Sequence, residues 1–202
     1  MLLLAIDTSA SLVSVALLMG KRNVRFCEQE MERGQGEALI SMIQELFESA
    51  RLNIKDLTGV AVAVGPGSFT GVRIGIATAR AIAMALDIPV YGVTNFEAYS
   101  YSILKPITVV LDSKRDDYFV QKFDGNGTAV DVPKIATAKQ MKKALPFTAV
   151  GSGANKLAGE IGCKVLNKIS PTAVSVGRVA LERLDHPMPA SPLYLREADV
   201  TL

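Results

Sequence analysis

The sequence has no tryptophan, two cysteines and a single histidine, so several common kinds of site lack their residues. Cys27 and Cys163 lie far apart with no CxxC spacing, and His186 stands between an aspartate and a proline. Zinc sites usually need four such ligands at short spacings. We therefore expect no metal site, and the pattern favours two free thiols in a reducing compartment over a disulfide.

Strong charge and long apolar segments are also missing. The net charge of +2 over 202 residues is too small to indicate nucleic-acid binding by itself. No uninterrupted apolar run approaches the roughly 20 residues of a membrane span, and the N-terminal MLLLAIDTSAS lacks the basic region of a signal peptide. We expect a cytoplasmic protein that binds no membrane, and the charge gives little support to direct RNA binding.

The most informative stretch that is present is GPGSFTGVRIGIATARAIAMAL at 65–86, which joins a glycine loop to a helix. It follows the buried strand expected at 60–64, and Ser68 or Thr70 can cap the first helical amides. The helix is expected from about Gly71 to Leu86, and small or apolar residues surround it. Such a helix is either covered by its own domain or partly left for another chain.

Hydrophobic periodicity gives the same order of elements twice. The expected elements of the first half are strands at 2–6, 12–19 and 23–28 with a turn at Gly20-Lys21, a helix at 37–51, a strand at 60–64, a helix at 71–86, a strand at 89–93 and a short helix begun by Thr94 or Asn95. Those of the second half are strands at 107–111, 118–123 and 128–132, a helix at 137–145, a strand at 147–150, a helix to about 160, a strand at 164–166 and a helix at 171–184.

The two halves also match in residues. LAIDTS at 4–9 corresponds to VVLDS at 109–113, and AVGPGS at 63–68 corresponds to AVGSGA at 149–154. These matches indicate a duplicated α/β protein with two lobes, each βββαβαβα, which is the ribonuclease-H-like order of actin-like ATPases. We assign the lobes to 1–104 and 105–202, and leave open that the C-terminal tail packs back on the first lobe.

The aspartates that end the first strand of each half suggest phosphate loops. In active members of the actin-like group, an aspartate and a small polar loop at the positions of Asp7, Thr8, Ser9 and Asp112, Ser113 hold metal and phosphate. Here the first loop has no glycine and the second is bulky and charged, which favours a structural role for both.

The glycine loop is a second candidate phosphate site, formed by Gly65, Gly67, Ser68 and Thr70. It has no lysine after its last glycine, as a Walker loop requires, and its GxGxxxG spacing differs from the GxGxxG of a Rossmann loop. We therefore interpret the loop of Asp7, Thr8 and Ser9 and the glycine loop as vestigial phosphate loops.

Several segments of the sequence, taken together, resemble those of a known family. They are VGPGSFTGVRIGIATARAIA, LAIDTSASLVSVAL, PVYGVTNFEAYS, VLDSKRDDYFVQKF and the C-terminal PLYLRE, and they resemble the TsaB (YeaZ) family of bacteria. The resemblance implies a non-catalytic partner of the related ligase TsaD, acting with the ATPase TsaE in forming threonylcarbamoyladenosine in tRNA. It also implies that the chain contacts tRNA only through this complex. Many family members carry a His-Ser pair where this chain has Gln35-Gly36.

The resemblance also implies an interface. In the family, the helices matching 37–51 and 71–86 pack against TsaD, or against a second copy when TsaD is absent. The interface residues expected on these helices are Leu39, Met42, Ile43, Leu46, Val72, Gly75, Ile76 and Ala79. No catalytic residue and no bound cofactor are expected, although a nucleotide at the joint interface stays open.

Three hypotheses follow in falling order. The first is a non-catalytic subunit of the tRNA-modifying complex, and the second is a small actin-like ATPase or kinase acting alone. The third is a dinucleotide-dependent enzyme, which the spacing of the glycine loop disfavours.

Overall fold

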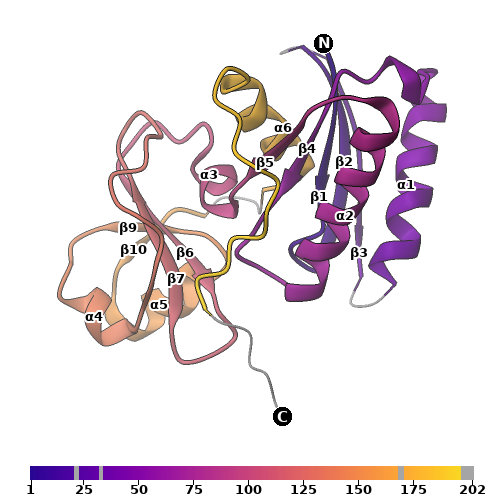
Figure 1. The fold of residues 1–202 in the computed structure, drawn as a ribbon. Helices are drawn as coiled ribbons and strands as arrows, with labels where there is room; N and C mark the ends of the chain where they lie inside the picture. Colours follow the sequence, from indigo (N-terminus) through magenta and orange to yellow (C-terminus); the bar gives the residue numbers. More distant parts are fainter. Residues whose placement is uncertain (21–22, 32–33, 168–170, 197–202) are drawn as a thin grey trace. The chain divides into compact units, whose positions relative to one another are not determined.

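The computed structural model describes residues 1–20, 23–31, 34–167 and 171–196. Lys21 of the predicted turn and Glu197 of the PLYLRE motif lie outside these residues. The chain divides into two compact units, which we treat separately (Figure 1). Unit 1 comprises Met1–Ala98 and Pro171–Pro192, and unit 2 comprises Tyr99–Ser170 and Leu193–Leu202.

Unit 1 is built on a five-stranded sheet of order β3-β2-β1-β4-β5. Its strands are β1 (Leu2–Asp7), β2 (Leu12–Met19), β3 (Asn23–Glu30), β4 (Gly59–Ala63) and β5 (Val90–Val93). The first three are antiparallel, whereas β4 and β5 run parallel to β1, so that Leu4 pairs with Leu17 on one side and with Val60 on the other. β1 and β4 are buried throughout, as their continuous apolar sequences predict.

Helices cover both faces of this sheet. α1 (Gln35–Ala50) and α2 (Phe69–Leu86) lie on one face, and α6 (Ala173–Glu182) lies on the other (Figure 1). Alternation along β1 explains the division, because Ile6 approaches α2 at Gly75 while Ala5 approaches α6 at Gly177. Two short elements complete the order: η1 (Ile54–Asp56) in unit 1, and α3 (Asn95–Ser100) at the boundary between the units.

The position of α6 corrects the predicted lobe boundaries. The sequence analysis placed this helix in the second lobe, within 105–202, but it packs on the unit 1 sheet. Its buried residues Ala173, Val176 and Ala180 join Leu3 and Leu18 in one apolar cluster. The backbone amide of Ala173 also donates to Ser14 Oγ at 2.8 Å. The predicted helix is therefore present, but it completes the core of unit 1.

Unit 2 repeats the same strand order as β8-β7-β6-β9-β10. Its elements are β6 (Ile107–Asp112), β7 (Tyr118–Phe123), β8 (Lys134–Ala136), α4 (Ala138–Lys142), β9 (Thr148–Val150), α5 (Ala154–Ile161) and β10 (Lys164–Val165). The strand predicted at 128–132 is wrong. That segment makes a single bridge, between Ala129 and Phe123, before Asp131 turns its carboxylate to the amide of Lys122.

One described helix, α2, is long and apolar enough by length and composition to cross a membrane. This differs from the expectation that no segment approaches that length. Length and composition do not separate a membrane span from a core helix, and α2 packs its Gly75 and Ile76 side against the unit 1 sheet.

Candidate functional site

The two loops suggested as phosphate sites in unit 1 pack tightly against each other. Ser68 donates its amide to the carbonyl oxygen of Ser9 at 2.7 Å, and Thr8 Oγ1 donates to the carbonyl oxygen of Gly71 at 2.7 Å. A Cβ atom at Gly67 would lie 2.3 Å from Ser9 O, and one at Gly71 would lie 2.0 Å from Thr8 O. The glycines are therefore needed for close packing of the α2 start on the end of β1.

Polar groups within these loops are largely satisfied by each other. Asp7 Oδ1 accepts from the amide and the hydroxyl of Ser9, at 2.9 and 2.6 Å. Asn95 Nδ2 donates to Ser9 Oγ and to Pro66 O, both at 2.8 Å. Ser68 Oγ accepts from the amide of Gly71 at 3.2 Å, which is the predicted cap of α2. Three amides at these loops, those of Ser9, Ser68 and Gly71, thus donate within the fold.

The equivalent loop of unit 2 is also closed on its own backbone. Gly151 has φ +121, and a Cβ there would lie 2.4 Å from Val110 O. The amide of Asp112 donates to Ser152 Oγ at 3.1 Å, so the second glycine turn binds the end of β6 directly. Ser113 Oγ donates to Asp117 Oδ1 at 2.6 Å, which closes the loop that follows.

The two aspartates at equivalent strand ends have opposite electrostatic environments. Burial raises the pKa of Asp7, against the lowering effect of its hydrogen bonds from Ser9. Burial also opposes ionisation of Asp112, but the Lys114 amide and the charges of Lys156 and Lys114 outweigh it and lower the pKa of Asp112. Lys114 and Lys156 each place Nζ 3.5 Å from this carboxylate. The aspartate is therefore present at the equivalent position of both units, but its electrostatic environment differs between them.

The residues predicted to form the partner interface are buried within unit 1. This set comprises Leu39, Met42, Ile43, Leu46, Val72, Gly75, Ile76 and Ala79. Ala79 and Leu39 are 0% exposed. They form the inner stripes of α1 and α2 and pack mainly against the sheet of their own unit, although Ile43 also lines an open groove. That these residues contact a partner stays a prediction, and the outer sides of the two helices are the more exposed candidates.

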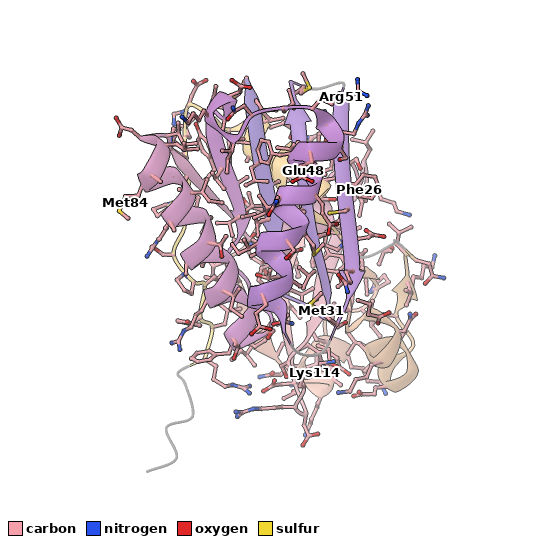
Figure 2. All side chains as sticks on the ribbon, turned by 90° about the vertical axis from the view of Figure 1, so that its right-hand side faces the viewer. Phe26, Met31, Glu48, Arg51, Met84 and Lys114 are labelled. Carbon is pink, nitrogen blue, oxygen red and sulfur yellow. The ribbon has the colours of Figure 1, made fainter. Side chains whose placement is uncertain are left out.

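A groove of about 720 Å³ lies between α1, the segment after it and α2. Its apolar lining comes from Ile40, Ile43, Phe47, Leu52, Ile54 and Ile82. Glu48 and Arg51 lie at the end of α1 beside it (Figure 2). An open apolar groove of this size on a helix pair is typical of a surface that another apolar group covers.

Apolar side chains also protrude from the outer sides of these helices. Ile40 on α1 is 55% exposed and Met84 on α2 is 83% exposed (Figure 2 labels Met84). The predicted interface residues do not include Ile40 or Met84, although their position around each helix could be read from the sequence. Each helical residue is turned by about 100° from the one before it, so Ile40 lies beside the buried stripe that contains Leu39, and Met84 lies off the stripe that contains Ala83.

Charge is segregated between the two helices. The exposed acids of α1 are Glu37, Glu45 and Glu48, whereas the exposed charges of α2 are Arg73 and Arg80. Arg73 lies over the ring of Phe69, 3.7 Å from its centroid. We call the outer sides of both helices, together with the groove, the α1–α2 face. An acidic and a basic helix side by side make this face electrostatically self-complementary under a two-fold rotation.

Comparison with known proteins places the chain in a family. Residues 29–176 match the sequence model of the family described as "TsaD: tRNA N6-adenosine threonylcarbamoyltransferase". An uncharacterised protein of Mycobacterium tuberculosis H37Rv is 31% identical over 199 residues, covering 97% of this chain and 92% of that protein. The tRNA threonylcarbamoyladenosine biosynthesis protein TsaB of Buchnera aphidicola is 28% identical over 183 residues, covering 83% and 86%. The chain belongs to the TsaD family, as one of its TsaB (YeaZ) proteins.

A solved TsaB (YeaZ) structure shows the same fold. YeaZ from Pseudomonas aeruginosa aligns with a TM-score of 0.80 at 22% sequence identity, covering 96% of this chain and 99% of that one. The duplicated ribonuclease-H-like fold predicted from strand order and internal repeats is therefore confirmed. Both units of this TsaB-family chain are represented in the alignment, since it spans nearly the whole sequence.

Proposed function

We propose that this chain is the non-catalytic subunit that binds the ligase TsaD and acts with the ATPase TsaE in threonylcarbamoyladenosine formation. The modified base is the adenosine next to the anticodon of tRNAs that read codons beginning with A. The observation that carries the proposal is the open, partly apolar α1–α2 face on a member of the TsaB family. Curated TsaB relatives are named as proteins of this biosynthesis.

The closed loops support a non-catalytic role. Phosphate cradles in active nucleotide-binding proteins need free backbone amides that can approach the ligand closely. In unit 1 the amides of Ser9, Ser68 and Gly71 donate within the protein. The space beside Gly67 and Gly71, where a ligand could approach, is occupied by the backbone of the Thr8–Ser9 segment. The remaining carboxyl, Asp7, is buried, and burial raises its pKa.

The chemistry of the α1–α2 face suits a helical partner. Ile40 and Met84 offer exposed apolar anchors, and the groove can receive a bulky apolar side chain. A partner helix with basic residues would pair with α1, and one with acidic residues would pair with α2. A second copy satisfies both conditions by symmetry, so we propose that a homodimer forms alone and that TsaD competes with it.

A small actin-like ATPase or kinase is the second candidate, because Asp7 and Asp112 stay at the ends of β1 and β6. The two proposals differ in what the purified chain does. An ATPase would turn over nucleotide by itself and would need Asp7. The subunit would turn over nothing alone.

Reconstitution tests the proposal directly. TsaD, TsaE, tRNA, ATP and threonylcarbamoyl-adenylate are incubated with and without this chain, and modified adenosine is measured by mass spectrometry of digested tRNA. We expect product only when the chain is present, and equal product from an Asp7→Asn variant because Asp7 has a structural role. Full product without the chain would overturn the proposal.

A further inference from the structure

Charge is unequally divided between the two units. Unit 2 contains 12 Lys and Arg against 8 Asp and Glu, a net charge of +4, whereas unit 1 contains 10 against 12, a net charge of −2. The small net charge of the whole chain therefore conceals a basic unit beside an acidic one. An uneven distribution of this kind attracts polyanions to the basic part.

Within unit 2, the densest group of lysines lies on α4 and its C-cap. Lys139, Lys142 and Lys143 occupy positions i, i+3 and i+4, so their side chains leave one side of the helix. All three are exposed, while Met141 points into the core of unit 2. We call these three residues the α4 lysine face.

The α4 lysine face is not neutralised within the described part of the chain. Two lysines of unit 2 elsewhere have acidic partners, since Lys134 contacts Asp131 at 3.0 Å and Lys156 contacts Asp112 at 3.5 Å. No ion pair joins any of the three α4 lysines to a described residue. Like charges at i, i+3 and i+4 repel one another, and an external polyanion relieves that repulsion.

We infer that the α4 lysine face binds the phosphate backbone of tRNA. The identity of the polyanion rests on the proposed function, which assigns the chain to a tRNA-modifying complex. Neighbouring lysines with Cβ atoms about 5–6 Å apart can contact successive phosphates of one strand. Three contacts give weak, sequence-independent binding, which positions tRNA held mainly by other subunits.

The test uses the purified chain without TsaD, so that its outcome is independent of the proposed complex. Fluorescence anisotropy of labelled tRNA is measured between 20 and 150 mM salt. With three phosphate contacts, the logarithm of the binding constant should fall with a slope of about 2–3 against the logarithm of salt concentration. Affinity should therefore drop about a hundredfold across this range, with no saturation at low micromolar protein in 150 mM salt.

Two triple variants isolate the α4 lysine face. Lys139→Gln, Lys142→Gln and Lys143→Gln together should weaken binding at 20 mM salt at least tenfold and flatten the salt slope. The matched control changes three other exposed lysines of unit 2 to Gln, namely Lys105, Lys122 and Lys164, and should retain affinity within about twofold. The inference is overturned if the wild-type chain does not bind at 20 mM salt, or if both variants lose affinity equally.

Discussion

At the scale of single residues, Asp7 and Asp112 show how duplicated positions diverge. Both end the first strand of a sheet, and both carboxylates face a following turn. Asp7 is enclosed with Ser9 and Asn95, whereas Asp112 lies between two lysines. Burial raises the pKa of Asp7, whereas at Asp112 burial is outweighed by the hydrogen bond from the Lys114 amide together with the charges of Lys156 and Lys114, so the two pKa values move in opposite directions.

Stability against pH should reveal these opposite shifts. The folded pKa of Asp7 is raised, so its contribution to stability is greatest below the unfolded pKa of 3.8 and falls as pH rises towards the folded pKa. Asp7→Asn should therefore become more stable relative to wild type as pH rises through this window. Asp112→Asn should do the reverse: Asp112 has a lowered pKa, and its stabilisation is lost as pH falls. Urea unfolding between pH 3 and 7 checks both signs, and parallel curves for the two variants would contradict the assignment.

Gly71 is a second residue whose identity the packing dictates. A Cβ at this position would lie 2.0 Å from the backbone oxygen of Thr8, which cannot move aside as a flexible side chain could. Gly71→Ala should destabilise unit 1 by about 1–3 kcal/mol or more, measured by urea unfolding.

Gly159 provides the matched control for that substitution. It lies in α5 with no atom within 4 Å of an added Cβ. Gly159→Ala should stabilise the chain by about 0.5–1 kcal/mol because alanine is the better helix former. Equal destabilisation by both substitutions would show that close packing at Gly71 is not the cause.

At the scale of secondary-structure elements, the sequence predicts which segments form but not always what they contact. β2 (Leu12–Met19) and β7 (Tyr118–Phe123) match their predicted bounds, because both are regular strands between clear turns. The spacing of small residues along the α6 segment predicts a helix that has one side made of small residues. It does not say which of two similar sheets receives that side, and the repeated order suggested the wrong one.

The predicted interface residues are buried for a related reason. Periodicity identifies the apolar stripe of α1, but the same stripe serves either a sheet of the same unit or another chain. Burial of Leu39 and Met42 shows that the unit 1 sheet uses it. The exposed apolar residues, Ile40 and Met84, differ from the buried ones only in their position around the helix. The separation of acidic α1 from basic α2 was readable in the sequence and was overlooked.

Removal of α6 tests its assignment to unit 1. A chain that ends at residue 170 would expose the face of the unit 1 sheet that carries Leu3, Ala5 and Leu18. We expect rapid hydrogen exchange and proteolysis throughout β1 and β4, with β6 and β9 still protected. Unit 2 keeps its own apolar cluster, which includes Val110, Tyr118 and Leu157. Loss of protection from β6 and β9 instead would show that α6 belongs to the second lobe.

At the scale of the whole molecule, we propose two units that offer surfaces to other molecules and carry out no chemistry of their own. Unit 1 presents the α1–α2 face, and unit 2 carries the excess of positive charge. We therefore expect no ATP hydrolysis by the purified chain in a phosphate-release assay with Mg²⁺. Steady hydrolysis that disappears in Asp7→Ala, while a folded Asp112→Asn variant retains it, would favour the ATPase hypothesis instead.

The central claim is that the α1–α2 face holds TsaD, and one charge placed on that face tests it. Ile40 is 55% exposed, so Ile40→Glu should fold normally while putting an unpaired carboxylate into the proposed contact. Leu104→Glu is the matched control, because Leu104 is 86% exposed and lies in unit 2.

Sedimentation velocity of each variant mixed with TsaD, with a thermal melt to verify folding, is the decisive measurement. We expect wild type and Leu104→Glu to form the complex, and Ile40→Glu to lose at least tenfold in affinity, which is about 1.4 kcal/mol. A folded Ile40→Glu variant that binds TsaD as tightly as wild type would contradict the account.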